Sequence, residues 1–414
     1  MRLASKIILI STFSILFGTY AHGCTISKPA VSAENEVGFE LTHGERVVFL
    51  GNSLIEYAQE YGYLEYALTT RWPERDVTFR NLGWTGDTVF GEARSYYTTP
   101  PESYELLVKQ LKETNPTVVF IGYGANEAYE GQEGIPAFKK GLQKLLVEIE
   151  SMGAQPILLS PIPQFSGLPP DQLAIRNKNL KRYSSVIKQT AYQNEIRYID
   201  LFSPFQRFGN KDQLTVDGIH LNETGYYYLA SVMEESLGLP PREWKVDIDI
   251  YSQVIETRGK LTILQSEFKN DGVQFTLDNA ILPLPPPTKD SAVRTNSKEF
   301  KIDGLAKGCY TLSIGASDVA SATAGRWSKG LQISHGILFD QAQELQKLIV
   351  NKNHLYFRKY RPHNRTYLIG FRSHEQGQHS KELEQLDLFI TRLEDQISQQ
   401  RKPTPAVYQV EAVK

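Results

Sequence analysis

The sequence predicts a three-layer α/β/α domain on a parallel five-stranded sheet, followed by a small β-rich region and C-terminal helices. Five short apolar runs between residues 45 and 201 alternate with segments long enough for helices. This is the pattern of strands that are buried on both faces of a parallel sheet. Beyond residue 241 apolar and polar residues alternate, which is the period of strands with one solvated face. Helical periodicity returns in the last part of the chain.

The elements of the first domain follow from these runs. Buried strands are expected at residues 47–50, 77–82, 117–122, 156–161 and 196–201. Helices are expected at residues 54–70, 103–113, 135–151, 173–194 and 223–237. In a parallel sheet ligands bind beyond the carboxyl ends of the strands, so catalytic residues are expected in the segments that follow the strands.

The second half of the chain is expected to hold one-sided strands and then helices. The strands are predicted at residues 246–256, 260–265, 273–277, 300–302 and 310–314, and the helices at residues 338–348 and 380–400. Residues 304–312 are typical of a hairpin in a β-sandwich, and the proline-rich run 282–287 predicts a stiff, extended link. The β-rich region is either a packing appendage or a carbohydrate-binding module. Interleaved Arg and aromatic residues at 356–372 indicate either a buried aromatic stripe or a surface for an anionic glycan or nucleic acid.

The first residues resemble a secretory signal peptide. Arg2 and Lys6 precede an apolar run at residues 7–17, and small and polar residues follow as far as Cys24. The run is shorter than the ~20 apolar residues that span a bilayer, which disfavours the alternative of a transmembrane anchor. Gly23-Cys24 resembles a bacterial lipobox, so secretion or a lipid anchor on Cys24 to the bacterial envelope both fit.

Length and composition limit the remaining classes. The chain has 414 residues, enough for two or three domains, and a net charge of -2 from 45 Lys+Arg and 47 Asp+Glu. It therefore has no basic field for the phosphates of a nucleic acid, and no nucleic-acid partner is expected. Cys24 and Cys309 are too few for a disulfide framework or a Cys-rich zinc site. The expected division is a signal peptide at 1–23, a tether at 24–42 and the first domain at 43–240. The β-rich region is expected at 241–335 and a helical C-terminal extension at 336–414.

Four polar segments follow strands of the predicted sheet. They are Gly51-Asn52-Ser53-Leu54, Asn81-Leu82-Gly83-Trp84-Thr85-Gly86-Asp87, Gly122-Tyr123-Gly124-Ala125-Asn126-Glu127 and Thr215-Val216-Asp217-Gly218-Ile219-His220-Leu221-Asn222. Across residues 45–240 they resemble the four blocks of the SGNH hydrolases, the superfamily that contains the GDSL lipases and esterases. The resemblance implies a flavodoxin-like α/β/α fold and acyl transfer from an ester. The C-terminal extension is similar to that of secreted SGNH-type hydrolases from environmental, planctomycete-like bacteria.

The resemblance implies that Ser53 is the nucleophile. A serine at a strand-to-helix turn is exposed, and its backbone N–H lies at the positive end of the next helix. Taken alone, Ser53 would more often be an N-cap residue than a nucleophile. Asn52 stands where the family more often has Asp, and Asn can shape the same turn.

His220 matches the general base and Asp217 the residue that orients it. A serine hydroxyl is a weak nucleophile until a base takes its proton. The Asp-x-x-His spacing lets both side chains reach one point from a single loop. The alternative for Asp217 is a turn cap, and for His220 a surface residue.

The resemblance also implies an oxyanion hole formed by the Ser53 N–H, the Gly83 N–H and the Asn126 side-chain amide. Fixed donors aimed at the developing negative charge contribute strongly to acyl transfer. A glycine at position 83 is expected because a side chain there would block the approach of the substrate carbonyl group. Without the other blocks, Gly83 would be an ordinary turn glycine and Asn126 a loop or cap residue.

No cofactor and no metal are implied. The remaining candidates for a metal site are histidines, and none forms a His-Glu-x-x-His signature. These residues are His43, His335, His354, His363, His374 and His379. His374 and His379 lie one residue beyond the helical i,i+4 spacing that would present both on one face.

The expected function is a secreted serine esterase that removes acetyl or other short acyl groups from a carbohydrate or small molecule. Secretion and the appended modules favour a polysaccharide ester as the substrate. The sequence shows no long apolar lid, which disfavours the alternative of a lipase or phospholipase. Aromatic residues near the cleft loops could stack on sugars or simply pack, namely Tyr57, Tyr61, Tyr63, Trp84, Tyr123 and Tyr129. The alternatives are an inactive scaffold or glycan-binding protein on the same fold, and a mononucleotide- or phosphate-binding protein that uses the helix near Ser53. The sequence does not indicate an oligomeric state.

Overall fold

The computed structural model describes residues 38–94, 102–269, 272–288, 298–362 and 379–413, all within one compact unit, Val37–Lys414. The expected signal peptide, Cys24 and most of the tether lie outside these ranges. The same is true of residues 363–372 of the aromatic stripe, of His363 and His374, and of the side chain of His379. Within the described ranges, no helix combines the length and the apolar character that crossing a membrane requires.

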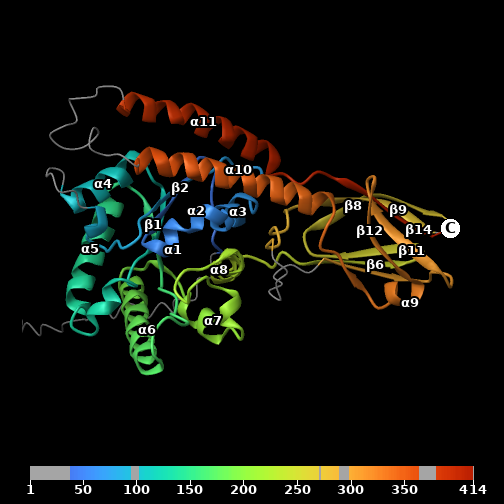
Figure 1. Cartoon of the computed structure of the whole chain (residues 1–414). Helices are drawn as coiled ribbons and strands as arrows, with labels where there is room; N and C mark the ends of the chain where they lie inside the picture. Colours follow the sequence, from blue (N-terminus) through green and yellow to red (C-terminus); the bar gives the residue numbers. More distant parts are fainter. Residues whose placement is uncertain (1–37, 95–101, 270–271, 289–297, 363–378, 414) are drawn as a thin grey trace, which may run out of the picture. The chain divides into compact units, whose positions relative to one another are not determined.

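A parallel five-stranded sheet forms the centre of the first domain, as predicted (Figure 1). The strands lie in the order β2-β1-β3-β4-β5. They are β1 (Arg46–Gly51), β2 (Thr78–Gly83), β3 (Val118–Gly122), β4 (Gln155–Leu159) and β5 (Arg197–Ile199). Val47 and Phe49 of β1 belong to the core on one side of the sheet, and Val48 and Leu50 to the core on the other. Successive side chains of a strand point to opposite faces, so a continuous apolar run fills both cores.

Helices cover both faces of this sheet. One layer contains α1 (Ser53–Glu56), α2 (Ala58–Tyr61), α3 (Tyr63–Thr69) and α8 (Glu223–Ser236). The other contains α4 (Ser103–Glu113), α5 (Ile135–Ser151) and α6 (Pro170–Gln193), and α7 (Phe202–Arg207) follows β5. Three short 3-10 helices are η1 (Glu92–Arg94), η2 (Glu127–Glu130) and η3 (Lys211–Gln213). The three layers confirm the predicted α/β/α class.

The helical stretch predicted at residues 54–70 is confirmed, but it is divided into the three short helices α1, α2 and α3. Gly62, between α2 and α3, has a φ of 68°. This left-handed conformation is strained for residues with a side chain and common for glycine at helix ends. Helical periodicity of the apolar residues does not register such a local break.

The β-rich region forms a two-sheet sandwich around its own core. One sheet has the order β13-β10-β6-β7 and the other β12-β11-β14-β9-β8. The strands are β6 (Trp244–Asp249), β7 (Val254–Arg258), β8 (Leu261–Lys269), β9 (Gly272–Asn279), β10 (Lys298–Asp303), β11 (Cys309–Ile314), β12 (Ser317–Thr323), β13 (Leu331–Gln332) and β14 (Ala406–Ala412), and a short helix, α9 (Ala324–Trp327), follows β12. Phe300 of β10 packs against Tyr408 of β14, with 5.6 Å between ring centroids, and so joins the two sheets.

The hairpin predicted at residues 304–312 is not formed. β10 and β11 lie in different sheets, and β11 pairs instead with β12 and β14. Gly304 has a φ of 84°, as expected in a turn, but the turn carries the chain from one sheet to the other. Turn composition alone does not determine which strands pair across it.

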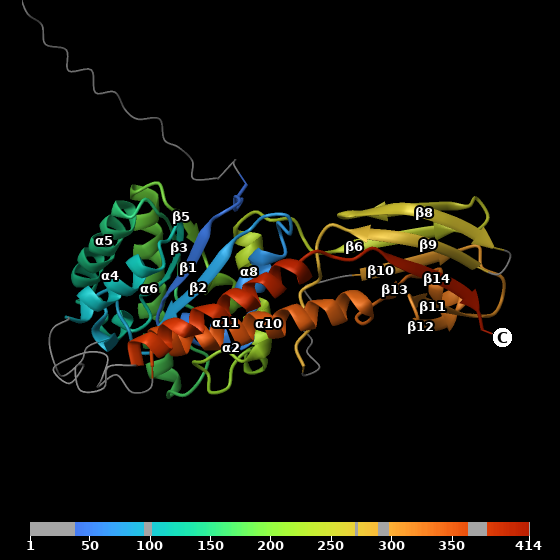
Figure 2. The ribbon, with the colours of Figure 1, turned by 90° about the horizontal axis from the view of Figure 1, so that it is seen from above.

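The C-terminal extension contains two long helices and then a strand, rather than helices alone. α10 (Ile337–Tyr360) packs along α11 (His379–Gln400), and both run beside the first domain (Figures 1 and 2). β14 then enters the sandwich between β9 and β11. The expected boundary at 335/336 therefore separates strands of one sheet.

α10 covers the edge strand β2 of the central sheet. The Lys352 ammonium is buried and donates to the Phe79 carbonyl oxygen of β2 (3.0 Å) and to Glu65 Oε2 of α3 (2.8 Å). Gln346 Nε2 donates to the Tyr61 carbonyl oxygen (2.8 Å). A covered edge cannot pair with another chain, and the extension is part of the packing of the first domain.

The proline-rich run at residues 282–287 has no regular secondary structure, and its first residues are buried against the first domain. Leu282 and Leu284 belong to the same core as α3 and α8. The phenols of Tyr63 and Tyr66 donate to the carbonyl oxygens of Pro285 (3.1 Å) and Pro283 (2.7 Å). The run is therefore a packed contact between the first domain and the sandwich.

Candidate active site

Ser53 is the first residue of α1, directly beyond the carboxyl end of the central strand β1. Gly51 at the end of β1 is in register with Gly83 of β2 and Gly122 of β3, so three strands end at one level. Asn52 Oδ1 accepts a hydrogen bond from the Leu54 N–H (3.2 Å) and caps α1. The Ser53 side chain is partly exposed, and its N–H has no acceptor among the described residues. Both groups are therefore available to a ligand.

Asp217 and His220 form a hydrogen-bonded pair on the loop before α8. Asp217 Oδ2 lies 2.7 Å from His220 Nδ1. The other carboxylate oxygen, Oδ1, accepts the backbone N–H groups of Ile219 (2.9 Å) and His220 (2.8 Å). Because Nδ1 faces the carboxylate, Nε2 is the ring nitrogen that is free to take a proton.

The electrostatics of this loop keep Asp217 ionised. Partial burial alone would raise the pKa of the Asp217 carboxyl, but hydrogen bonds from His220 and Ile219 outweigh it and lower the pKa to about 2. An ionised Asp217 favours the tautomer of the His220 ring that carries its proton on Nδ1.

Ser53 and His220 line the same cavity, which has a volume of about 60 Å³. It lies between the ends of β1, β3 and β4, the start of α6 and the loop of His220. Its other lining residues are Asn52, Leu54, Gly122, Ala125, Ser160, Pro161, Ile162, Pro163, Gln164, Arg176, Leu180, Ile219, Leu221 and Tyr226. The structure thus brings together the expected nucleophile and base, although they are separated by more than half of the first domain in sequence.

Gly83 does not fit its expected role as an oxyanion donor. Its N–H already donates to Asn81 Oδ1 (2.8 Å), and the residue is buried. A Cβ atom at Gly83 would lie 2.1 Å from the Glu56 nitrogen. The glycine is therefore needed because α1 packs against β2 there, and not because a substrate carbonyl approaches it.

A second glycine of the same loop has the free N–H that Gly83 lacks. Gly86 is exposed, has a φ of 82°, and has no hydrogen-bond acceptor for its N–H in the part of the chain that the structure describes. Asn126 Nδ2 donates to the carbonyl oxygen of the next residue, Asp87 (2.7 Å). Only one of the two amide protons of Asn126 is used in this bond, so the second remains for a ligand.

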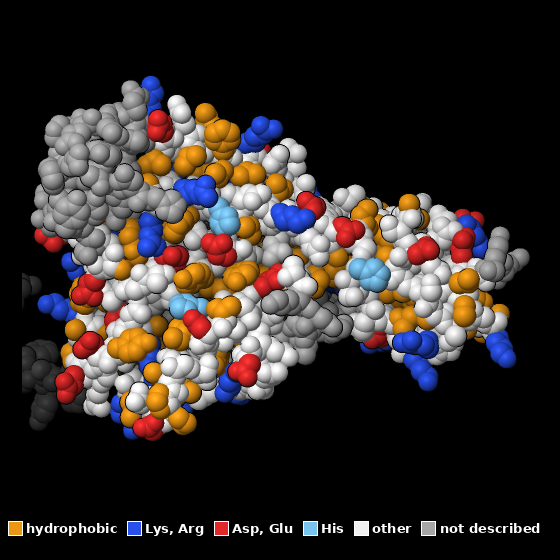
Figure 3. All heavy atoms as spheres, viewed as in Figure 1, with side chains coloured by type: hydrophobic (Ala, Val, Ile, Leu, Met, Phe, Trp, Pro, Cys, Tyr) orange, Lys and Arg blue, Asp and Glu red, His pale blue; other side chains and the backbone are white. Residues whose placement is uncertain are grey.

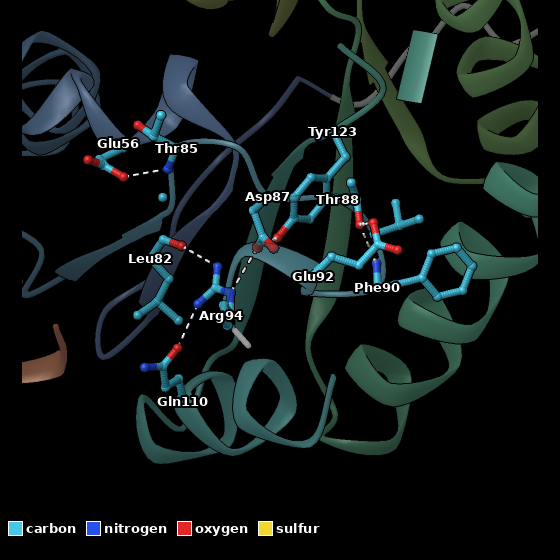
Figure 4. Close-up of polar contacts among 12 residues, drawn as sticks. Glu56, Leu82, Thr85, Asp87, Thr88, Phe90, Glu92, Arg94, Gln110 and Tyr123 are labelled. Carbon is cyan, nitrogen blue, oxygen red and sulfur yellow. Dashed lines mark hydrogen bonds and ion pairs between the residues drawn. The ribbon is translucent and has the colours of Figure 1, made fainter. Parts of the chain in front are cut away.

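A buried polar network fixes this loop (Figure 4). Asp87 Oδ2 accepts hydrogen bonds from Arg94 Nε (2.8 Å) and from the Tyr123 phenol (2.8 Å), and both members of the ion pair are fully buried. Arg94 also donates to Gln110 Oε1 (2.6 Å) and to the Leu82 carbonyl oxygen (2.8 Å). Sequence analysis missed Arg94 and Gln110, because an Arg and a Gln outside the four segments carry no motif.

Glu127 links the loops that follow β2 and β3. Its two carboxylate oxygens accept the N–H groups of Val89 (2.9 Å) and Gly124 (2.8 Å). Burial raises the pKa of Glu127 to about 7, although these backbone N–H groups act in the opposite direction. This contact holds Asn126, the preceding residue, against the Asp87 loop.

Two of the six aromatic residues expected near the cleft are exposed. Tyr57 is 37% exposed and Tyr129 is 62% exposed, whereas Tyr63, Trp84 and Tyr123 are buried. The Tyr57 ring packs edge-on against the His220 imidazole, with 5.1 Å between centroids. The guanidinium of Arg176, which lines the cavity, lies 3.6 Å from the centre of the Tyr129 ring. Tyr57 and Tyr129 do not line the cavity themselves, but each is exposed and contacts a residue that does.

No group of three or more His, Cys, Asp or Glu residues within the described ranges is placed to hold a metal ion. His43 accepts the N–H of Asp76 (3.1 Å), and His354 pairs with Glu60 (3.0 Å). Acidic and basic side chains are interspersed on the face of the molecule in Figure 3.

A protein family and several solved structures are similar to this chain. Residues 49–228 match the model of the GDSL-like lipase/acylhydrolase family. Among curated proteins, no match was found. A solved structure of a gut microbial diltiazem-metabolizing enzyme is 18% identical, with a TM-score of 0.69 over 90% of this chain and 99% of that one. The shared fold thus extends into the second half of the chain.

An acetylxylan esterase from Geobacillus stearothermophilus is also similar. It is 18% identical, with a TM-score of 0.38 over 49% of this chain and 98% of that one. Residues 49–228 are thus similar to the GDSL-like lipase/acylhydrolase family, and the protein is an ester-hydrolysing enzyme.

Proposed function

We propose that the protein is a serine esterase in which Ser53 is the nucleophile, His220 the general base and Asp217 the residue that orients His220. The observation that carries the proposal is the cavity shared by Ser53 and by the His220 ring, whose Nδ1 is held by Asp217. A nucleophile, a base and an orienting carboxylate in this order are the parts that acyl transfer to serine requires.

The chemical steps follow from these positions. His220 Nε2 takes the Ser53 hydroxyl proton as Oγ attacks the ester carbonyl carbon, and the imidazolium then returns the proton to the leaving alcohol. In the second half of the reaction, His220 takes a proton from a water molecule as the water attacks the carbonyl carbon of the acyl-enzyme. The acid is released, and the proton passes to Ser53 Oγ. The Ser53 N–H, the Gly86 N–H and the second amide proton of Asn126 are the donors for the oxyanion. Gly86 replaces Gly83 in this set because its N–H is free.

The size of the cavity supports a short acyl group. Its volume of about 60 Å³ leaves room for a few water molecules. An acetyl group is of that size, whereas a fatty acyl chain is far larger. The exposed rings of Tyr57 and Tyr129 beside the cavity favour a carbohydrate alcohol, because aromatic faces pack against sugar rings. The substrate class proposed is therefore an acetylated or similarly short-chain ester of a carbohydrate.

A serine-directed phosphonate probe tests the proposal. The wild-type protein should be labelled at Ser53, and Ser53→Ala should lose both the label and the hydrolysis of p-nitrophenyl acetate. Acetylated xylan should be deacetylated, and p-nitrophenyl palmitate should be a poor substrate. Turnover that survives in Ser53→Ala would end the serine-esterase proposal. Absence of labelling and turnover in the wild type would instead favour a scaffold or glycan-binding protein.

We also propose that the protein acts outside the cytoplasm, secreted or lipid-anchored to the bacterial envelope through Cys24. The support is the order of a basic start, an apolar run and Gly23-Cys24 in the sequence. A polymeric ester substrate would be met in that compartment.

A further inference from the structure

The last turn of α10 contacts the loop that follows β2, at the active-site edge of the sheet. The Tyr360 phenol donates to the Gly83 carbonyl oxygen (2.6 Å), although the two residues are 277 positions apart. Burial raises the pKa of Tyr360, so the phenol keeps its proton and remains a donor at neutral pH. The Tyr360 carbonyl oxygen accepts a hydrogen bond from Gln110 Nε2 (3.2 Å), and Gln110 also holds Arg94 (2.6 Å).

Arg361 follows directly and connects this loop to α1. Its Nη1 lies 2.6 Å from Glu56 Oε2, and its guanidinium lies 4.2 Å from the centre of the Trp84 ring. The same Glu56 oxygen accepts the N–H of Thr85 (2.5 Å; Figure 4). Glu56 ends the one-turn helix that begins with Ser53. One carboxylate therefore joins the helix of the nucleophile, the loop of Gly86 and the C-terminal extension.

The contacts lie directly before the residues that present the oxyanion donors. Tyr360 holds the loop at Gly83, and Arg361 holds it at Trp84 and, through Glu56, at Thr85. The next residues are Gly86 and Asp87, whose carbonyl oxygen is the partner of Asn126. Neither Tyr360 nor Arg361 lines the cavity of Ser53 and His220, so neither is placed to touch the reacting ester.

We propose that Tyr360 and Arg361 are positioning residues of the esterase, through which the C-terminal extension sets the loop at residues 83–87 and the alignment of its oxyanion donors. This inference rests on the proposed function. Donors stabilise the transition state only when they are held where the negative charge develops. Loss of either contact should therefore lower kcat, whereas KM for a small ester should stay unchanged.

The test uses the full-length protein with two pairs of variants. Tyr360→Phe removes one hydroxyl group, and Tyr356→Phe makes the same change one helical turn earlier, away from the loop. Arg361→Ala removes the ion pair and the stacking on Trp84, and Arg358→Ala removes an exposed arginine of α10, three residues earlier. For p-nitrophenyl acetate we expect Tyr360→Phe and Arg361→Ala to lower kcat by about 3- to 10-fold each. The two control variants should keep the wild-type kcat.

A second measurement separates positioning from a general loss of structure. In an Asn126→Ala background, Tyr360→Phe should cost less in kcat than it does in the wild type, because both changes affect the same donors. Arg361→Lys should recover part of the loss, since it restores the charge but not the planar stack. Thermal melting of each variant provides the structural reference.

The outcomes distinguish this inference from the proposed function. Wild-type kcat in Tyr360→Phe and Arg361→Ala, with Ser53 still labelled by the phosphonate probe, would overturn the positioning role and leave the esterase intact. A loss of kcat that is fully additive with Asn126→Ala, and matched by a fall in melting temperature, would also overturn it. If the wild type is neither active nor labelled at Ser53, the proposed function itself fails.

Discussion

Arg242 and Glu234 form a buried ion pair where the first domain meets the sandwich, with 2.6 Å between Arg242 Nη2 and Glu234 Oε1. Arg71 Nε donates to the same carboxylate oxygen (2.7 Å). Arg242 also donates to the carbonyl oxygens of Leu282 (2.6 Å) and Ala67 (2.7 Å). The Arg242 guanidinium thus connects α8, α3 and the proline-rich run. The two halves of the chain are therefore joined by a buried cluster of charged side chains.

Replacing Glu234 should destabilise both halves together. Burial would raise the pKa of the Glu234 carboxyl, but Arg242 and Arg71 hold it below its ordinary value, so the group is ionised. Glu234→Gln leaves two buried guanidinium groups without a counter-charge, which costs about 3–5 kcal/mol. Denaturant unfolding should show this loss in one cooperative transition. The neighbouring Glu235→Gln, an exposed position on the same helix, is the control; equal stability of the two variants would contradict the prediction.

The two glycines of the β2 loop should respond differently to a side chain. Gly83→Ala places a Cβ 2.1 Å from the Glu56 nitrogen, so we expect a stability loss of several kcal/mol, on the order of 3 or more. At Gly86 the atom nearest to an added Cβ would be Ala93 Cβ, at 3.8 Å. Gly86→Ala should therefore cost only about 1 kcal/mol of stability, from backbone strain at positive φ. Its kcat should fall because the N–H moves.

Gly153→Ala is the matched control for Gly86→Ala. Gly153 has a φ of 74°, and nothing lies within 4 Å of its Cβ position, so the backbone strain is similar but far from the cavity. Thermal melting and p-nitrophenyl acetate kinetics of the three variants are compared. Full activity in Gly86→Ala with the stability loss of Gly153→Ala would remove Gly86 from the oxyanion donors.

Cys24→Ser tests the proposed lipid anchor. If the mature protein begins at an acylated Cys24, metabolic labelling with a palmitate analogue should mark the wild type and not the variant. Cys309→Ser controls for labelling of the second cysteine, which is exposed and free. Equal label in Cys24→Ser and the wild type would contradict the anchor, whereas export without any label would indicate ordinary secretion.

The sequence predicts the parts of this molecule that depend on neighbouring residues and misses those that depend on distant ones. That Ser53, Asp217 and His220 lie close together could be predicted, because each lies in a local motif and parallel strands end at one edge of the sheet. The choice between Gly83 and Gly86 as the oxyanion donor depends on which N–H group is free. The Gly83 N–H donates to Asn81 Oδ1, and the spacing of the motif does not reveal this bond. β14 reaches its partner β9 from more than a hundred residues away, and Tyr360 reaches Gly83 from 277. Such long-range pairings follow from the assembled fold.

Lys298 should make the stability of the protein depend on pH. Burial, with Arg242 nearby, lowers the pKa of Lys298 from 10.5 to about 7. Between these two values the unfolded chain binds one more proton than the folded protein, so stability rises with pH. Over pH 7.5 to 9.5 we expect a gain of about 2 kcal/mol in the wild type relative to Lys298→Met. Chemical denaturation at several pH values measures this change. Lys301→Met, on the same strand but partly exposed, should show the pH dependence of the wild type. If Lys298→Met also keeps that pH dependence, the lowered pKa of Lys298 is not its cause.

Asp217→Asn should separate orientation of the base from binding of the ester. The variant cannot hold the proton of the His220 ring on Nδ1 with a charge, so kcat should fall by about 10⁴-fold, as in other Ser-His-Asp systems, whereas KM should change little. Because the pKa of Asp217 is about 2, its carboxylate stays ionised throughout the range from pH 4 to 9. Any acid limb of kcat/KM in that range must then come from a group other than Asp217. Wild-type kcat in Asp217→Asn would contradict the assignment of the pair.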